Sequence, residues 1–273
     1  MPSTAFKILV FATFATFALK KGGKLNRKNV IQILLLILLL GFSLRLARCY
    51  LVDNFDKDGV SYIRMGQYFA QGESEKAIGI RPEMPLLYVY LIAVGTETGL
   101  SAEYSGKFIN FIAGLFIILA LFLIARNVFN DKIALAAAFL GAVHPDFIEE
   151  STGIMRESLA LCFMMFGLYF AMSAIKKFSW IKWCVAGLFT GLCALTRPEG
   201  MELLLVIPVW LVISFIFYSE ERKDILLKAL PGFILFIIFF FIVVFPVQIY
   251  FQKYGSIYNV LIDTKMLRIY LGV

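Results

Sequence analysis

The sequence predicts an all-α polytopic membrane protein, and three observations support this fold class. Of the 273 residues, 60% are hydrophobic and only 16% are charged, and the mean hydropathy is +0.83. A soluble domain is closer to a quarter charged, and apolar runs such as ILLLILLLGF and GFILFIIFFFIVVF would leave large apolar patches on its surface. The short alternating segments of a transmembrane barrel do not occur, so helices are the expected spanning elements.

Seven apolar runs fit membrane-spanning helices, and an eighth is too short. The expected spans are residues 30–51, 106–128, 131–147, 156–175, 181–197, 200–218 and 230–251. The eighth run, residues 85–100, has about 11 apolar residues before Thr96, roughly half of a bilayer crossing. We therefore expect seven transmembrane helices, with 85–100 forming a half-inserted or interfacial helix.

The distribution of Lys and Arg supports that choice. If residues 85–100 do not cross, the basic stretch 20–28 and the loops 126–132, 176–182 and 219–229 all lie on one side, which the positive-inside rule makes the cytoplasm. The outer side then receives the segments that carry most polar side chains. These segments are the large loop 52–105, the loop 144–158, the turn 195–200 and the tail after Lys253.

The N-terminal residues 1–29 are expected to be separate from the membrane module, residues 30–273. Residues 5–19 are apolar but short, and Lys7 interrupts them. The basic stretch follows this run, whereas a cleaved signal peptide carries its charge before the apolar core, so we do not expect a signal peptide. Two alternatives remain open for residues 5–19: an interfacial anchor or an additional short span.

Composition also argues against several other functions. The net charge of +7 comes from short basic loops that set topology, so we expect contact with membrane lipids and no nucleic acid. The four cysteines and the single histidine lack the spacing of a metal site or a disulfide framework. Neither a Gly-rich phosphate loop nor a hydrolase or zinc-protease signature occurs, so the sequence does not support use of a nucleotide sugar at the inner face. We expect no cofactor, and the sequence gives no support for a divalent metal.

The stretch DNFDKDGVSYIRMGQYFAQG, residues 53–72, follows the first span with three aspartates in six residues. From Gly59 onward, helical spacing places Tyr62, Met65 and Phe69 on one face, which predicts an amphipathic helix along the membrane surface. A structural interpretation of Asp58 is the N-cap of this helix. The corresponding interpretation of the other two aspartates is a solvated loop.

Four motifs in order resemble the GT-C-fold membrane glycosyltransferases, in the branch of protein O-mannosyltransferases and lipid A aminoarabinose transferase. They are Asp58-Gly59-x-x-Tyr62 after the first span, RPEMPLLYVY from residue 81, HPDFIEESTGIMRESL from residue 144 and GLFTGLCALTRPEG from residue 187. The resemblance covers residues 30–251. Two departures concern the first loop: the commoner family form is Asp-Glu rather than Asp-Gly, and the usual Lys-Pro-Pro-Leu is stretched here.

The resemblance implies a glycosyltransferase whose donor is a polyprenyl-phosphate sugar and whose acceptor is a lipid, a glycan or a protein. It places the active site at the outer face of the membrane, here the inner membrane of a bacterial cell. The first-loop acidic residue is the general base in this family, and Asp58 matches it best, with Asp56 as the second candidate. Such a reaction needs a carboxylate to take the proton of the acceptor and cationic groups to stabilise the departing phosphate.

The remaining candidates are assigned to substrate binding. Arg81 and Arg197 are the expected phosphate contacts, Glu157 is expected to support the site and to approach Asp58, and Tyr62 and Glu199 complete the set. For Arg197 a structural alternative is open, in which the charges of the turn only anchor it among headgroups. We expect Arg156 to pair locally, and Glu149 and Glu150 to be solvated.

Two other classes of function are compatible with a polytopic chain. A transporter or lipid flippase would show charges in the middle of spans, inverted repeats or matching broken helices, and the spans here are mostly free of charge. A non-catalytic scaffold would give the external acids and arginines no reason to converge. The test is whether Asp58, Arg81, Glu157 and Arg197 gather around one outward-facing site.

Overall fold

The computed structural model describes residues 26–51, 57–217 and 220–258. All regular elements within these ranges are helices, which confirms the predicted all-α class. Residues 5–19 and two of the three aspartates of the first loop, Asp53 and Asp56, lie outside the described ranges.

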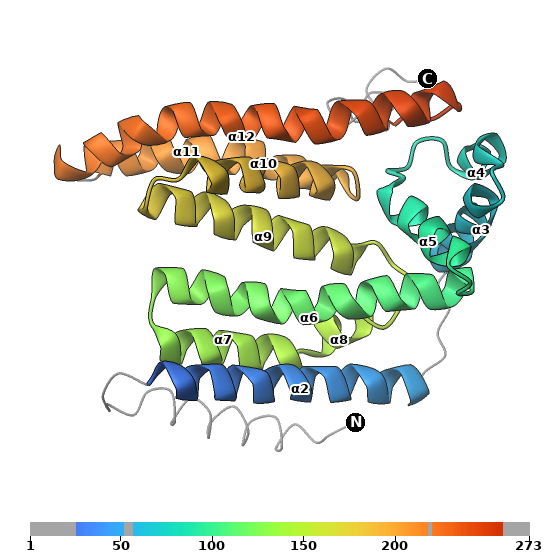
Figure 1. Cartoon of the computed structure of the whole chain (residues 1–273), viewed down its shortest axis with the longest axis horizontal. Helices are drawn as coiled ribbons and strands as arrows, with labels where there is room; N and C mark the ends of the chain where they lie inside the picture. Colours follow the sequence, from blue (N-terminus) through green and yellow to red (C-terminus); the bar gives the residue numbers. More distant parts are fainter. Residues whose placement is uncertain (1–25, 52–56, 218–219, 259–273) are drawn as a thin grey trace.

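Seven helices coincide with the seven expected spans and lie side by side in one layered bundle (Figure 1). They are α2 (Arg27–Leu51), α6 (Ala102–Val128), α7 (Asp131–Val143), α9 (Glu157–Lys176), α10 (Trp180–Ala194), α11 (Glu202–Phe217) and α12 (Glu220–Lys253). In the described part of the chain, α2, α6, α9 and the portion Ala229–Lys253 of α12 are long and apolar enough to cross a membrane. The other three have 13, 15 and 16 residues.

Two boundaries differ from the expected ones for identifiable reasons. The run 131–147 ends as a helix at Val143, and α8 (Pro145–Glu150) starts separately, because the residue before a proline disfavours helical dihedrals and His144 is extended (φ −65°, ψ 123°). The stretch 219–229 was expected to be a loop, but α12 already begins at Glu220. Its residues are mostly good helix formers, so the helix extends beyond its apolar part.

The contact between α10 and α12 depends on glycines four residues apart. A Cβ atom on Gly187 would overlap the backbone carbonyl of Phe236, and one on Gly191 would lie 3.1 Å from the carbonyl oxygen of Phe240. Small residues at this spacing allow helix backbones to approach closely, which is how helices associate when the surrounding solvent is lipid.

The outer surface of the bundle is apolar, as a lipid-facing surface requires. Large apolar side chains on α2, α11 and α12 are exposed, with Leu36 at 65%, Leu205 at 71% and Ile249 at 64%. A soluble protein rarely exposes so much apolar surface. Together with the four candidate spans, this surface identifies an integral membrane protein.

The two ends of the bundle differ. At one end Arg126 pairs with Asp131 at 2.7 Å, and the Lys176 ammonium donates to the carbonyl of Asn127 at 2.7 Å. The other end is covered by α3 (Lys57–Ala70), α4 (Ser74–Ile80) and α5 (Leu87–Glu97), together with α8 and the 3₁₀ turn η1 (Pro198–Met201) (Figure 1). Helix α5, with 11 residues, is about 16 Å long and cannot cross a bilayer core of about 30 Å.

The predicted amphipathic helix exists as α3, and its apolar face is buried by protein. Tyr62 stacks edge-to-face on Tyr88 of α5 with ring centroids 5.6 Å apart, and a Cβ on Gly66 would overlap the side chain of Ile92. The apolar face of α3 therefore packs against α5 and does not lie against lipid as expected.

Candidate functional site

The first polar cluster at this end is the ion pair of Asp58 and Arg81. Asp58 lies in the first turn of α3, and Arg81 follows the last residue of α4. The Arg81 Nη2 atom donates to the Asp58 Oδ1 atom at 2.7 Å, and both side chains remain partly exposed. This hydrogen bond is the main reason why the pKa of Arg81 is raised. Because α3 begins at Lys57, Asp58 is not the N-cap of the helix, and its carboxylate binds a side chain 23 residues away.

Backbone contacts fix the segments that carry this pair. A Cβ on Gly59 would lie 3.2 Å from the carbonyl oxygen of Ile154, so the start of α3 packs on the turn before α9. The Pro82 carbonyl accepts from the backbone N–H groups of Ile257 and Tyr258, at 2.9 and 3.2 Å, beyond the end of α12. The Leu87 N–H donates to the Leu195 carbonyl at 3.2 Å. Segments from four parts of the sequence therefore meet here.

The second cluster joins Arg197 to two carboxylates. Its Nη1 atom donates to Glu157 at 2.7 Å, while its Nη2 and Nε atoms donate to the two oxygens of Glu199 at 2.7 and 3.1 Å. Hydrogen bonding to Glu199 is the largest cause of the raised pKa of Arg197, and the same bond lowers the pKa of Glu199. Arg197 is thus held by the protein, which argues against a role only as a headgroup anchor.

Tyr62 lies near both clusters. Its side chain is 1% exposed, and burial is the main cause of the raised pKa of its hydroxyl. The charges of Arg156 and Glu157 from one side, and of Asp58 and Arg81 from the other, also act on that pKa. The structure therefore places the candidates Asp58, Arg81, Glu157, Arg197, Glu199 and Tyr62 at the same end of the bundle. Asp58 and Glu157 belong to separate ion pairs there.

Arg156 was expected to pair locally, and this prediction is wrong. It is the N-cap residue of α9, and its Nε and Nη1 atoms are buried without a hydrogen-bond partner. The Oε2 atom of the adjacent Glu157 is also buried and unpaired. Side chains of adjacent helical residues point in different directions, which explains why this pair does not form.

Asn110 was missed by the sequence analysis and holds the turn that precedes Arg156. It is fully buried in α6, and its Nδ2 atom lies 2.8 Å from the Gly153 carbonyl, 2.5 Å from the Met155 carbonyl and 3.1 Å from the Tyr88 hydroxyl. The sequence feature that could have identified Asn110 is a carboxamide within an apolar run, because polar groups inside membrane segments are costly and therefore mark a structural or functional role.

Arg45 was also missed, and it secures α8. This side chain of α2 is fully buried, and its Nε and Nη1 atoms donate to the Ser151 hydroxyl at 2.8 Å and to the Gly41 carbonyl at 3.1 Å. All of its acceptors are neutral groups. Arg45 thus links the first span to the residues that follow α8, and its signal was again a charge inside an apolar run.

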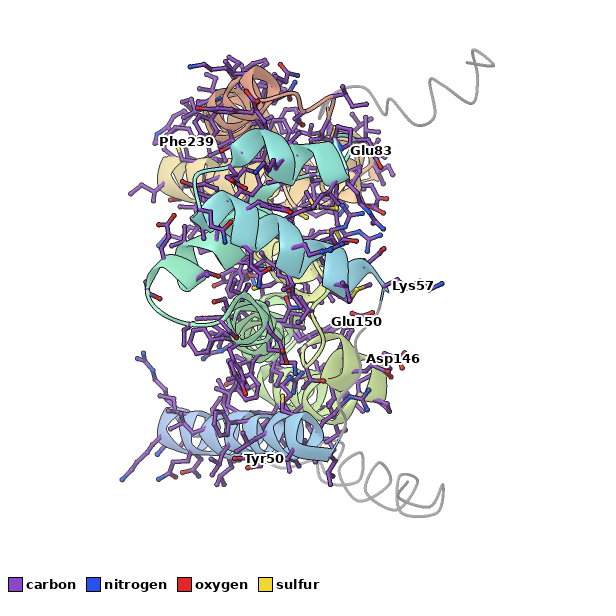
Figure 2. All side chains as sticks on the ribbon, turned by 90° about the vertical axis from the view of Figure 1, so that its right-hand side faces the viewer. Tyr50, Lys57, Glu83, Asp146, Glu150 and Phe239 are labelled. Carbon is purple, nitrogen blue, oxygen red and sulfur yellow. The ribbon has the colours of Figure 1, made fainter. Side chains whose placement is uncertain are left out.

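The two glutamates of α8 differ in environment. Glu149 is well exposed and pairs with Arg48 at 2.9 Å. Glu150 is only partly exposed, and its pKa is raised, first by burial and then by the nearby charges of Glu157 and Asp146. Figure 2 looks onto this end of the molecule and shows Glu150 on the same side as Lys57, Glu83 and Asp146. The expectation of a solvated side chain fits Glu149 better than Glu150.

The described residues offer no group of three or more His, Cys, Asp or Glu side chains arranged to hold a metal ion. Instead, the arrangement combines carboxylates that can accept a proton with guanidinium groups that can bind an anion. All of these groups lie at one end of an apolar bundle.

Comparison with known proteins identifies a family for this chain. No curated protein sequence matches the chain. Residues 83–250, well over half of the chain, match the family described as dolichyl-phosphate-mannose-protein mannosyltransferase. The match includes Glu157, Arg197 and Glu199, whereas Asp58, Tyr62 and Arg81 precede it. With its helical membrane bundle and its cluster of acids and arginines, the chain belongs to the dolichyl-phosphate-mannose-protein mannosyltransferase family of membrane glycosyltransferases.

Proposed function

We propose that this protein transfers a sugar from a polyprenyl-phosphate donor to a lipid, glycan or protein acceptor, with Asp58 as the general base. The observation that carries the proposal is the pair of acid–arginine clusters near Tyr62 at one end of the bundle. The family match favours glycosyl transfer over transport as the activity.

The proposed reaction is a displacement at the anomeric carbon of the sugar. An acceptor hydroxyl oxygen forms a bond to that carbon as the bond from the carbon to the phosphate oxygen breaks. The electron pair of the broken bond leaves with the polyprenyl phosphate, and the acceptor proton passes to the Asp58 carboxylate. Negative charge grows on the departing phosphate, where a guanidinium group stabilises it.

Arg81 holds the Asp58 carboxylate through a 2.7 Å hydrogen bond, which fixes the position of the proposed base in the first turn of α3. Its partial exposure leaves a route for the acceptor.

We further propose that this end of the bundle faces outward, at the outer face of a bacterial inner membrane. Arg126, Lys132, Lys176 and Lys182 lie in or beside the connections at the opposite end. Short basic connections are retained on the cytoplasmic side. In this proposal residues 30–273 form the transmembrane catalytic module, and residues 1–29 precede it.

The direct test is a transfer assay on the purified protein in lipid nanodiscs. Polyprenyl phosphates carrying different single sugars are supplied one at a time with lipid, glycan and peptide acceptors, and release of the free polyprenyl phosphate is measured. At least one donor should give release that depends on an added acceptor, whereas a nucleotide sugar should give none. Release from nucleotide sugars alone would contradict the proposal.

A further inference from the structure

Three buried polar atoms without partners belong to two consecutive residues at the start of α9, and the charges of both residues act on the Tyr62 hydroxyl. These atoms are the Nε and Nη1 atoms of Arg156 and the Oε2 atom of Glu157. Among the described residues only five buried side-chain nitrogen or oxygen atoms lack a hydrogen bond, and these two consecutive residues hold three of them. Buried polar atoms in native proteins are nearly always paired, and an unpaired charged group is especially costly. A ligand that completes these bonds would explain the arrangement.

The neighbouring arginines do not share this property. Arg81 is paired with Asp58 and Arg197 with two glutamates. Arg48 is paired with Glu149, and the guanidinium group of Arg45 is bound by a hydroxyl and by backbone carbonyls. An anion that bound Arg81 or Arg197 would have to compete with a carboxylate already 2.7 Å away. Arg156 offers two donors with no such competitor.

The position of Arg156 adds a further attraction for an anion. It is the N-cap residue of the 20-residue helix α9, and no side chain caps the N–H groups of the first turn. Unpaired N–H groups and the helix dipole favour negative charge at this point. The Arg156 charge offsets part of the rise in the pKa of the Tyr62 hydroxyl, so Arg156 lies near this tyrosine.

The unpaired Oε2 atom of Glu157 needs a hydrogen-bond donor, whereas the unpaired nitrogens of Arg156 need an acceptor. The Oε1 atom of Glu157 is bound by Arg197, while Oε2 has an unused capacity to accept a hydrogen bond. A carboxylate oxygen needs a donor such as a hydroxyl group. Donors on one residue and an acceptor on the next therefore suit a ligand in which an anion and a hydroxyl-rich group are directly joined.

We propose that Arg156 binds the phosphate of the lipid-linked donor and that the Oε2 atom of Glu157 accepts a hydrogen bond from a hydroxyl of the attached sugar. This inference rests on the proposed function of the same site. It moves the main phosphate contact from Arg81 and Arg197, which hold carboxylates, to an arginine that holds none. Each of the unpaired Nε and Nη1 atoms can act together with Nη2 of the planar guanidinium group in a bidentate bond to phosphate oxygens.

Binding of farnesyl phosphate, which has the phosphate but no sugar, tests the role of Arg156. The protein is placed in nanodiscs, and the affinity is measured by titration. Arg156→Gln should weaken binding by about 10- to 100-fold, the worth of hydrogen bonds to a charged group. Arg156→Lys should lie in between, because it keeps the charge but loses the bidentate geometry. Arg64→Gln is the matched control: Arg64 is exposed on α3, so its replacement should leave the affinity unchanged.

Farnesyl phosphate bearing a single sugar tests Glu157. Glu157→Gln should bind farnesyl phosphate at least as tightly as the unaltered protein, because a negative charge beside the anion is removed. The same variant should bind the sugar-bearing compound less tightly, since the charged acceptor is lost. Loss of affinity for farnesyl phosphate in Glu157→Gln would contradict the assignment of the phosphate to Arg156 and of the sugar hydroxyl to Glu157.

Other outcomes separate this inference from the proposed function. If Arg156→Gln binds farnesyl phosphate normally while Arg81→Gln or Arg197→Gln loses affinity, the phosphate lies elsewhere and glycosyl transfer still stands. If the unaltered protein binds neither compound and transfers no sugar, the proposed function itself fails. An Arg156→Gln protein that binds weakly but unfolds at the same temperature as the unaltered protein supports a direct contact.

Discussion

Truncation of Asn110 to alanine should loosen the turn that carries Arg156. The Nδ2 atom of Asn110 lies 2.8 Å from the Gly153 carbonyl and 2.5 Å from the Met155 carbonyl, so both lose their donor in Asn110→Ala. A buried carbonyl without a donor costs about 1–3 kcal/mol, whereas hydrogen bonds measured within membrane proteins average about 0.6 and reach about 1.7 kcal/mol. The two ranges overlap between about 1 and 1.7 kcal/mol per bond.

Two lost carbonyl bonds therefore predict a loss of about 2–3 kcal/mol in the free energy of unfolding. The Oδ1 atom of Asn110 is buried and unpaired, so its removal returns part of that energy, and we expect the lower figure. The same substitution should also weaken farnesyl phosphate binding, because the backbone that positions Arg156 is freed. Asn110 would thus act as a positioning residue.

Unfolding can be followed with a thiol-reactive dye during heating, because Cys162 and Cys193 are buried in the native bundle. Thr98→Ala is the control: it removes an exposed hydroxyl that bonds only to the nearby Gly95 carbonyl, and such surface changes cost about 0.5 kcal/mol or less. If Asn110→Ala unfolds at the same temperature as the unaltered protein and binds farnesyl phosphate equally well, the assigned role of Asn110 is refuted.

Three further predictions concern packing, pH and topology. Gly187→Ala should destabilise the bundle by about 1–3 kcal/mol through overpacking against α12, whereas Gly79→Ala, with open space around its Cβ, should be neutral or slightly stabilising in thermal unfolding. The raised pKa of Glu150 means that the native state binds its proton more tightly than the unfolded chain, so Glu150→Gln should raise stability at neutral pH. That gain should disappear below the ordinary pKa of 4.5. Lys177→Cys in intact cells should resist a membrane-impermeant maleimide, and labelling from outside would reverse the topology.

Hydrophobic periodicity was sufficient to predict most of the fold. The spans at 30–51 and 106–128 correspond closely to α2 and α6, and the spacing of Tyr62, Met65 and Phe69 predicted the buried face of α3. These features are local, because apolar length and period determine a helix and its buried face. The apolar face of α3 is covered by α5, which comes from a different part of the loop. The sequence pattern of α3 alone therefore predicted that this face lies against lipid.

The boundaries required information that periodicity does not carry. His144-Pro145 was a usable signal for the end of α7, but the apolar residues that follow it concealed the break. The start of α3 at Lys57 was missed because its first residues are charged and give no periodic signal. Asp58 there binds Arg81 across 23 residues of sequence, a contact that no local rule contains.

The sequence predicted which residues form the candidate site but not which of them pair with one another. The expected outer segments and the family resemblance together identified Asp58, Arg81, Glu157 and Arg197, and the structure brings all four to one end. Which acid binds which arginine depends on the packing of α3, α9 and η1. For the same reason, the unpaired state of Arg156 could not be inferred from its position beside Glu157.

The role of Asp58 can be separated from that of its ion pair. Asp58→Asn keeps the size of the side chain but cannot take the acceptor proton, whereas Arg81→Gln breaks the same ion pair and leaves the carboxylate in place. A partly exposed pair of this kind contributes about 0–1 kcal/mol to stability. If Asp58 serves only to hold Arg81, the two substitutions should therefore reduce activity to a similar extent.

The most direct test of the account is the rate of sugar transfer by Asp58→Asn with a saturating polyprenyl-phosphate sugar. The account predicts a fall of about 10²- to 10⁴-fold, the usual contribution of a general base, with a smaller loss in Arg81→Gln and in Asp56→Asn. An active Asp58→Asn protein beside an inactive Asp56→Asn protein would move the base to Asp56. Full activity in both aspartate variants would contradict the claim that this stretch of the first loop is the catalytic site.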